Sequence, residues 1–372
     1  DINEEKVAVI NQIKGKLLSA TKDTFRLSEC DIICICVPTP IDKAKNPDLS
    51  VLEDVLTQIS KNLRPGQLII IESSVAAGTT RGFVLPILEK SNLKISQDFF
   101  LAYSPERIDP GNSQFDIRNT PKVVGGIDDN SKKLAVEFYG QFVEKVVLVS
   151  SVEVAEMSKV LENTFRFVNI SLINEIAAFT KSAGIDIWQV IEAASTKPFG
   201  FLAHYPGPGV GGHCIPVLPY HLLASAKKQK VKLRIVETAA VVNEAQPKTV
   251  AKQAIEIVNG RLNKNGYTPK VLLIGVSYKP ETANIRGSPA LKIWEILESQ
   301  GFSVSYHDPH VPAINGFSSK ELTQKVLKTT DLIIITTAHK NIPYDKLLKS
   351  GKPIIDTRNA LAGFANPNIP RV

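Results

Sequence analysis

The sequence predicts an α/β protein in which two doubly wound domains are joined by a central region of long helices. Short apolar runs alternate with helical patterns over residues 1–150, as a parallel sheet with crossover helices requires. One long helical pattern begins at Val152, and the alternation returns after Gly266. Since 372 residues are too many for one core, we expect three parts, at 1–150, 151–262 and 263–372.

The first part contains five strand-sized apolar runs, several of which end in polar residues. A helical pattern with apolar side chains at Leu52, Leu56 and Ile59 separates the first two runs. Ligands bind beyond the carboxyl ends of strands in a doubly wound sheet, so the residues that follow the runs are candidates for a binding site. The runs are 31–37, 67–71, 99–103, 123–127 and 146–149, and the candidates are Val37, Pro38, Thr39, Glu72, Ser73, Ser74, Glu106 and Arg107.

The central helical pattern carries one long apolar stripe. Lys159 and Asn163, four residues apart, fall on the opposite side of the helix. The stripe is long enough to serve both its own domain and a partner, so we expect a homodimer through the central helices. Its members are Val154, Met157, Leu161, Phe165, Val168, Leu172 and Ile176.

The last part repeats the alternation of the first. Ser288 is a predicted helix N-cap, with Pro289 at the first helical position and Gly301 closing the helix. Both terminal parts are therefore expected to be Rossmann-like domains. The predicted strands of the last part are 271–276, 302–306, 332–337 and 353–356.

Composition restricts the partners and the compartment. The net charge is +7, but lysines and arginines are spread along the chain, so no nucleic-acid partner is expected. No apolar run approaches the ~20 residues that a bilayer requires, and the start lacks a signal-peptide pattern, so we expect no membrane insertion. Four cysteines make no disulfide framework, which favours the cytoplasm. Cys34 and Cys36 are expected to pack in the core.

The usual dinucleotide signature is missing from the start of the chain. No Gly-x-Gly-x-x-Gly follows a strand there, and the match at Gly207, Gly209 and Gly212 has no strand before it, so a loop is expected. Asp1 lies where an acidic residue would bind an adenosine ribose. We therefore expect the given sequence to begin just after a second strand and to omit residues near Asn11; a defective cofactor site is the alternative.

Cys214 is the strongest candidate for a nucleophile. It lies in a glycine-rich loop, 205–214, whose backbone N–H groups can bind an anion, and His213 precedes it. A free thiol with a pKa near ~8.5 is little ionised at neutral pH, so a cation such as Lys159 would have to favour the thiolate or stabilise an oxyanion. A packed cysteine in a rigid turn and a solvated lysine remain the alternatives.

Seven segments, in order along nearly the whole chain, resemble the UDP-glucose/GDP-mannose dehydrogenase family, closest to its UDP-N-acetylglucosamine 6-dehydrogenase branch. The cysteine loop is the most specific of them. The segments are Val37-Pro-Thr-Pro40, Tyr103-Ser-Pro-Glu-Arg-Ile-Asp-Pro-Gly-Asn112, Ala155-Glu-Met-Ser-Lys-Val-Leu-Glu-Asn163, Gly207-Pro-Gly-Val-Gly-Gly-His-Cys-Ile-Pro216, Gly275-Val-Ser-Tyr-Lys-Pro280, Arg286-Gly-Ser-Pro289 and Asp356-Thr-Arg358.

The resemblance implies an NAD-dependent enzyme of polysaccharide biosynthesis. It would oxidise C6 of a UDP-sugar, most closely UDP-N-acetylglucosamine, to a uronic acid through a thiohemiacetal and a thioester on Cys214. UDP-N-acetylmannosamine and UDP-glucose remain open. Lys159, Asn163 and Glu106 would complete the catalytic group; Asp1, Val37, Pro38, Thr39, Ser74 and Arg286 would bind NAD; Arg107, Gly207, Gly209, Gly211, His213, Lys279 and Arg358 would bind the substrate.

Three positions depart from the pattern of the family. Leu218 replaces an aspartate thought to help activate water, and the loss of a general base typically costs ~10²–10⁴-fold in rate. Ser74 replaces a threonine, and Asn284 replaces an aspartate. A nucleotide-sugar-binding protein without turnover is therefore the rival function.

Two weaker alternatives concern histidines. A cysteine hydrolase is disfavoured because adjacent His213 and Cys214 do not form the usual dyad by themselves. The histidines of the sequence His-Asp-Pro-His at 307–310 could suggest a metal, but a capped loop after a strand is favoured. No metal site is expected.

Overall fold

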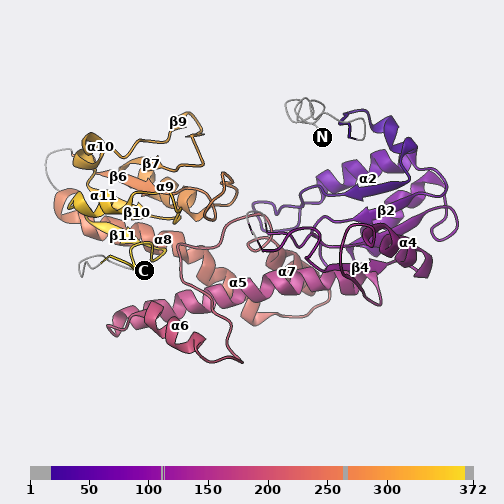
Figure 1. Ribbon diagram of the computed structural model, residues 1–372, viewed down its shortest axis with the longest axis horizontal. Helices are drawn as coiled ribbons and strands as arrows, with labels where there is room; N and C mark the ends of the chain where they lie inside the picture. Colours follow the sequence, from indigo (N-terminus) through magenta and orange to yellow (C-terminus); the bar gives the residue numbers. More distant parts are fainter. Residues whose placement is uncertain (1–17, 110–111, 113, 263–266, 365–372) are drawn as a thin grey trace. The chain divides into compact units, whose positions relative to one another are not determined.

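The computed structural model describes residues 18–109, 112, 114–262 and 267–364 (Figure 1). Asp1 and the segment near Asn11 lie outside the described residues. The chain divides into two compact units, Asp1–Val160 and Leu161–Val372. The predicted division into three parts stays a prediction.

Five strands form the sheet of the first unit and are adjacent in sequence order (Figure 1). The β1–β2, β2–β3 and β4–β5 pairs are parallel, but β4 is antiparallel to β3. The described residues between Tyr103 and Lys122 form no crossover helix, so the chain starts β4 at the edge where β3 ended. The sheet departs from a wholly parallel one at this pair. The strands are β1 (Ile32–Ile35), β2 (Leu68–Ile71), β3 (Phe100–Tyr103), β4 (Lys122–Gly126) and β5 (Val146–Leu148).

Helices cover both faces of this sheet, as a doubly wound domain requires. The helices α2 (Ser50–Asn62) and α3 (Leu85–Leu88) pack on the face that carries Ile69. The helix α4 (Asp129–Tyr139) packs on the opposite face, which carries Ile70. Shorter helical segments are η1 (Thr24–Glu29), η2 (Thr80–Val84) and η3 (Glu89–Ser91).

Cys34 and Cys36 are exposed, so the expectation that both pack in the core is wrong. Cys34 in β1, and Cys36 directly after it, alternate with the buried Ile33 and Ile35. Cys34 lies on the side of the sheet that carries Ile70, its partner in the register. The helix on that side, α4, packs against β2 to β5. Alternation places the cysteines on one face correctly, but that face is not covered at β1 by α4.

On the long helix α5 (Val152–Ser182), polar residues are buried and the apolar stripe is exposed. Leu161 and Leu172 in the stripe are 60% and 50% exposed, whereas Lys159 and Asn163 on the other side are 7% and 6% exposed. A helix at the surface of a monomer normally presents the reverse pattern. The stripe is therefore a large apolar surface on the single chain.

The second unit holds the rest of α5, three further long helices and a second sheet (Figure 1). None of the helices within the described ranges combines the length and the apolar character that crossing a bilayer demands. The helices are α6 (Ile187–Ser195), α7 (Leu218–Lys228), α8 (Arg234–Leu262), α9 (Pro289–Ser299), α10 (Gln324–Thr329) and α11 (Tyr344–Lys349); the strands are β6 (Lys270–Ile274), β7 (Ser303–His307), β8 (Ala313–Ile314), β9 (Phe317–Ser318), β10 (Leu332–Ile335) and β11 (Ile354–Asp356).

The second sheet is parallel throughout, in the order β11-β10-β6-β7. The helices α8 and α9 cover one face, and α10 and α11 cover the other, so the doubly wound prediction is confirmed. Ser288 caps α9 as predicted, by accepting the N–H of Ala290, with Pro289 in the first turn. The chain order reverses between β6 and β10, and the carboxyl edge at such a reversal is where ligands bind.

Two loop backbones approach each other closely at this reversal. Gly275, directly after β6, has φ +75°, and a Cβ there would lie 2.3 Å from the carbonyl oxygen of Thr337. Gly316, between β8 and β9, has a similar φ of +86°, but a Cβ added there would have nothing within 4 Å. The two glycines therefore share a backbone conformation and differ in the space around them.

Gly275→Ala is expected to destabilise the protein more than Gly316→Ala. Both substitutions place a Cβ on a left-handed residue, which costs ~1–2 kcal/mol. Gly275→Ala also forces the Thr337 backbone to move, which adds ~1–3 kcal/mol. Thermal unfolding of the two variants measures the difference. Equal Tm values would contradict the close approach.

A buried carboxyl on α5 holds the loop after β2. The two oxygens of Glu156 accept the backbone N–H groups of Gly78, at 2.5 Å, and Thr80, at 2.7 Å. Burial raises the pKa of Glu156 to about 7, although these hydrogen bonds oppose the rise. The folded chain therefore binds this proton more tightly than the unfolded chain does.

Glu156 is expected to make stability fall as the pH rises. Because its pKa is raised on folding, its contribution is complete below pH 4.5, the ordinary value, and is lost as the pH passes through about 7, by up to about 3 kcal/mol. Glu156→Gln removes the titrating group and is expected to flatten this part of a Tm profile against pH. Glu153→Gln is the control, because Glu153 lies on the same helix, is half-buried against Arg81 and has its pKa lowered rather than raised. A Glu156→Gln profile that overlays the parent's would refute the assignment.

Candidate active site

The loops after β1 and β2 are joined at the carboxyl edge of the first sheet. The Thr39 hydroxyl donates to the Ser74 carbonyl at 2.5 Å, and the Ser73 hydroxyl donates to the Val37 carbonyl at 2.7 Å. Three residues predicted to bind the cofactor, Val37, Thr39 and Ser74, therefore lie in one group. Pro38, between them, is exposed.

Lys159 and Glu106, predicted to act together, are in contact. The Lys159 ammonium donates to the Glu106 backbone carbonyl and lies 3.6 Å from the Glu106 Oε2 atom. This contact joins α5 to the loop after β3 and fixes a buried positive charge there. Arg107 makes a different contact. Its guanidinium donates to the Pro121 carbonyl at 2.8 Å, within the connection between β3 and β4.

A second charged group at this edge joins Glu72, a predicted candidate, to Tyr139 and Lys122, which the sequence analysis missed. The Glu72 carboxylate accepts the Tyr139 hydroxyl and pairs with the Lys122 ammonium at 3.2 Å. Burial and the charge of Glu72 raise the pKa of Tyr139. These three side chains line a cavity of about 130 Å³, together with Glu106 and Arg107. The sequence offered no signal for the pairing, because the reversed direction of β4 brings Lys122 to this edge.

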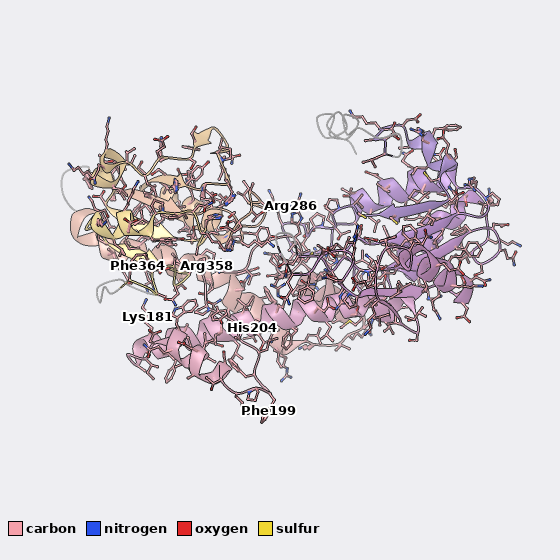
Figure 2. The ribbon with its side chains drawn as sticks, viewed as in Figure 1. Lys181, Phe199, His204, Arg286, Arg358 and Phe364 are labelled. Atoms are coloured by element: carbon pink, nitrogen blue, oxygen red, sulfur yellow. The ribbon has the colours of Figure 1, made fainter. Side chains whose placement is uncertain are left out.

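In the second unit, Gly207 lies against Arg358. A Cβ at Gly207 would be 2.6 Å from Nη1 of Arg358, and the Nε of Arg358 donates to the Thr336 carbonyl at 3.0 Å. Burial lowers the pKa of Arg358 to about 10, and Asp356 opposes the fall, so the guanidinium keeps its charge at neutral pH. Two predicted substrate residues from distant loops therefore meet; Figure 2 labels Arg358.

Two helix asparagines, which the sequence analysis missed, hold the glycine-rich loop. Asn174 on α5 accepts the Gly207 N–H at 2.8 Å. Asn243 on α8 accepts the Val210 N–H at 2.8 Å. Both side chains are buried, and a buried polar side chain normally requires a partner. An asparagine on the inward side of a helical pattern was the signal available in the sequence.

The backbone conformation at Gly209 and the lack of space around Gly211 each favour glycine over a residue with a side chain. Gly209 has φ +120°, and a Cβ on Gly211 would lie 2.8 Å from Cβ of Tyr278 and 2.9 Å from the carbonyl oxygen of Gly287. Side chains here would push the loop away from the connection between β6 and α9. The role of these glycines in binding substrate stays a prediction.

His213 and Arg286 are neighbours (Figure 2 labels Arg286). The Arg286 guanidinium donates to His213 Nδ1 at 2.8 Å, and the amide nitrogen of Asn284 lies 3.1 Å from Nε2 of the same ring. Burial and the charge of Arg286 lower the pKa of His213, so the imidazole is neutral at neutral pH. Lys279, in the same connection, accepts the Ser277 hydroxyl through its carbonyl at 2.9 Å.

Cys214 is half-buried and forms no disulfide. Its carbonyl accepts the N–H groups of Val217, at 3.1 Å, and Leu218, at 2.9 Å, so the cysteine begins the turn that leads into α7, whose positive dipole end favours negative charge. Leu218 is fully buried. Cys214 and Asn163 belong to the second unit, and Lys159 to the first. Their action on one substrate stays a prediction.

Models of three domains from one family match this chain. The NAD binding domain of the UDP-glucose/GDP-mannose dehydrogenase family matches residues 1–143, the central domain matches 153–245, and the UDP binding domain matches 272–363. The matches run in the same order along the chain.

Individual relatives match over nearly the whole chain. UDP-N-acetyl-D-mannosamine dehydrogenase of Pyrococcus horikoshii is 33% identical over 366 residues, which cover 97% of this chain and 84% of the relative. UDP-N-acetyl-D-glucosamine 6-dehydrogenase of Pseudomonas aeruginosa is 33% identical over 374 residues, with 95% and 88% covered. The solved structure of the UDP-D-ManNAc dehydrogenase from Pyrococcus horikoshii has a TM-score of 0.88 at 31% identity and covers 100% of this chain and 91% of that one. Because domain models and full-length relatives agree, the chain belongs to the UDP-glucose/GDP-mannose dehydrogenase family and is an NAD-dependent UDP-sugar dehydrogenase.

Proposed function

We propose that this chain oxidises C6 of a UDP-N-acetylhexosamine to the carboxylate in two steps, with Cys214 as the covalent nucleophile. The observation that carries the proposal is the buried ammonium of Lys159, which is held against Glu106. A cation fixed in a site poor in water is what an oxyanion at C6 requires for stabilisation.

The loops after β1 and β2 fit the NAD that the family uses. The hydrogen bond between Thr39 and Ser74 holds hydroxyl and backbone groups together at the carboxyl ends of parallel strands, where dinucleotides bind. Val37 and Pro38 would flank the same ligand, and Arg286 is proposed as a further NAD-binding residue. Bound NAD supplies the hydride acceptor for both oxidations.

The residues of the chain would act in turn on the sugar. Lys159, with the Asn163 amide, would stabilise the oxygen at C6 as the alcohol loses a proton and a hydride. The sulfur of Cys214 would then add to the aldehyde carbon, and the second oxidation would convert this thiohemiacetal into a thioester. Water would attack the thioester carbonyl, break the C–S bond and restore the thiol. Glu106 would order or activate that water, because Leu218 cannot accept a proton.

The UDP group would bind at the carboxyl edge of the second sheet. Arg358 keeps its charge there, and Lys279 lies in the loop after β6, beside the reversal of strand order where ligands bind. A guanidinium pairs well with phosphate oxygens. The remaining substrate residues are proposed to be Arg107, Gly207, Gly209, Gly211 and His213.

The sugar is proposed to be N-acetylglucosamine, with N-acetylmannosamine as the alternative. The segments 109–112 and 196–200 resemble the glucosamine branch, but relatives named for mannosamine are more numerous. NADH formation from each UDP-sugar, with UDP-glucose as a third, separates these substrates. Binding of a UDP-sugar without NADH formation would favour the rival function, a protein that lost turnover.

Cys214→Ser is expected to stop the reaction after the first oxidation, because alcohol oxidation needs no thiolate. In a single turnover it is expected to yield at most one NADH per sugar, against two for the parent chain. Lys159→Ala is expected to slow both oxidations by ~10²–10³-fold, the effect of losing one oxyanion donor. Lys133→Ala, at an exposed position of α4, is the control. Two NADH per sugar from Cys214→Ala at the parent rate would refute the covalent scheme.

We also propose a homodimer through α5. The apolar stripe is exposed along the helix, and two copies related by a two-fold axis can cover the same stripe on each other. Introducing Leu161→Glu together with Leu172→Glu is expected to shift dimer to monomer in sedimentation at micromolar concentration, because buried charges oppose association. Val51→Glu, an exposed apolar position on α2, is the control and is expected to leave the dimer intact. If the parent chain sediments as a monomer at this concentration, the proposal is wrong.

A further inference from the structure

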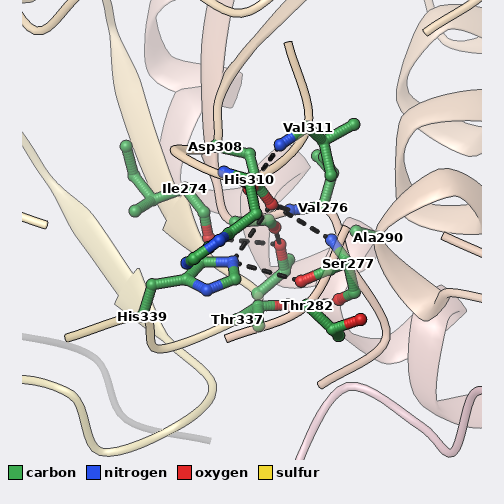
Figure 3. A network of polar contacts seen from close by, with 12 residues as sticks. Ile274, Val276, Ser277, Thr282, Ala290, Asp308, His310, Val311, Thr337 and His339 are labelled. Carbon is green, nitrogen blue, oxygen red and sulfur yellow. Dashed lines mark hydrogen bonds and ion pairs between the residues drawn. The ribbon is translucent and has the colours of Figure 1, made fainter. Parts of the chain in front are cut away.

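Three side chains that the proposed reaction does not use converge at the carboxyl edge of the second sheet. Glu281 follows β6, His310 follows β7 and His339 follows β10. One candidate ligand atom from each lies within 4.8 Å of the other two. The Nε2 of His310 is 3.7 Å from Glu281 Oε2, and the Nδ1 of His339 is 3.8 Å from Glu281 Oε1. Figure 3 shows the two histidines side by side.

The expected capped loop at 307–310 is confirmed. Oδ1 of Asp308 accepts the backbone N–H groups of His310, at 2.8 Å, and Val311, at 3.1 Å. The same turn directs the side chain of His310 toward Glu281. The sequence could not indicate this convergence, because the three residues follow three different strands.

Asp308 also orients His339 (Figure 3). His339 is 1% exposed, and its Nε2 lies 3.1 Å from Asp308 Oδ2. The backbone N–H of Glu281 donates to Nδ1 of His339 at 3.0 Å, so Nδ1, the ring nitrogen nearest Glu281, carries the lone pair. The proton therefore lies on Nε2, which donates it to Asp308. A carboxylate that holds one histidine nitrogen so that the other can coordinate is the usual support of a metal-binding histidine.

The polar atoms of the cluster also point to a ligand. His310 Nε2 is buried and has no hydrogen-bond partner among the described residues. His339 Nδ1 accepts the Glu281 backbone N–H at 3.0 Å, and Glu281 Oε1 accepts the Lys340 N–H at 2.8 Å. A cation would replace the first of these hydrogen bonds with a coordinate bond. The second can persist, because a carboxylate oxygen has more than one lone pair.

We propose that Glu281, His310 and His339 bind one divalent transition-metal ion of the zinc type. Two imidazole nitrogens and a carboxylate coordinate Zn²⁺ at ~2.0–2.2 Å, which places tetrahedral ligand atoms roughly 3.4 Å apart. The separations of 3.7 and 3.8 Å run to the two different oxygens of Glu281, and the ligand atoms lie within 4.8 Å of one another, so side-chain rotation would have to draw them closer to reach this spacing. Nitrogen ligands disfavour Mg²⁺ and Ca²⁺. Three protein ligands leave one coordination position open, and the ion would join the loops after β6, β7 and β10.

Metal titration of the full chain, stripped with a chelator, tests the proposal. Co²⁺ and Zn²⁺, each added alone, are expected to bind saturably with one equivalent at this site, and Zn²⁺ is expected to raise the Tm. Glu281→Gln and His310→Ala are each expected to weaken Zn²⁺ binding by more than ~100-fold, beyond the usual effect of losing a supporting residue. His307→Ala is the matched control, because the His307 ring contacts the Lys320 carbonyl and lies outside the cluster. It is expected to bind like the parent chain.

The exposed pair Cys34 and Cys36 can also bind metal, so every titration is repeated in a Cys34→Ser, Cys36→Ser background. Retention of the site in that background supports the proposal. Loss of all binding there, or parent-like affinity in Glu281→Gln or His310→Ala, overturns it, as does absence of binding at micromolar Zn²⁺. If His310→Ala fails to fold, His310→Gln takes its place with the same expectation.

Discussion

The position of the glycine-rich loop depends on a close approach between Gly207 and the guanidinium of Arg358. Arg358 donates a hydrogen bond to the carbonyl of Thr336, directly after β10. The guanidinium therefore links the position of the glycine-rich loop to the second sheet. The same loop continues to His213, which contacts Arg286, and then to Cys214. The position of Cys214, the proposed nucleophile, is therefore linked through this loop to the strand ends of the second sheet, and a side chain at Gly207 would disturb that link.

The helix α5 has the distribution of residues that this arrangement requires. Its inward side carries Lys159, Asn163 and Asn174, all buried, and buried polar groups are retained in proteins when they have partners. Lys159 contacts the loop after β3, and Asn174 contacts the glycine-rich loop. The apolar side of the helix faces outward. The proposed catalytic residues and the proposed dimer surface therefore lie on opposite sides of one helix, and substitutions on either side are expected to have separable effects.

The order of strands and helices was predictable because hydrophobic periodicity and caps such as Ser288 are local signals. Cys34 and Cys36 were placed on the correct face but wrongly buried, because alternation does not reveal which helix covers a face. The direction of β4 was hidden, since a strand has the same pattern in either direction. Lys159 was identified through motif resemblance, whereas Asn243 has a partner distant in sequence and belongs to no quoted motif. Contacts between loops that are distant in sequence produce no repeating pattern of residue types from which they could be predicted.

Two of the contacts that hold the glycine-rich loop come from neutral amides. The Asn174 and Asn243 side chains hold it through hydrogen bonds to backbone N–H groups. Dissolved salt screens charges over about a Debye length, but it has little effect on buried bonds between uncharged groups. Raising the ionic strength is therefore expected to leave these two hydrogen bonds, and the backbone that they hold, unchanged. If Arg358 and Lys279 bind an anionic ligand as proposed, its affinity would fall with added salt while the loop kept its geometry.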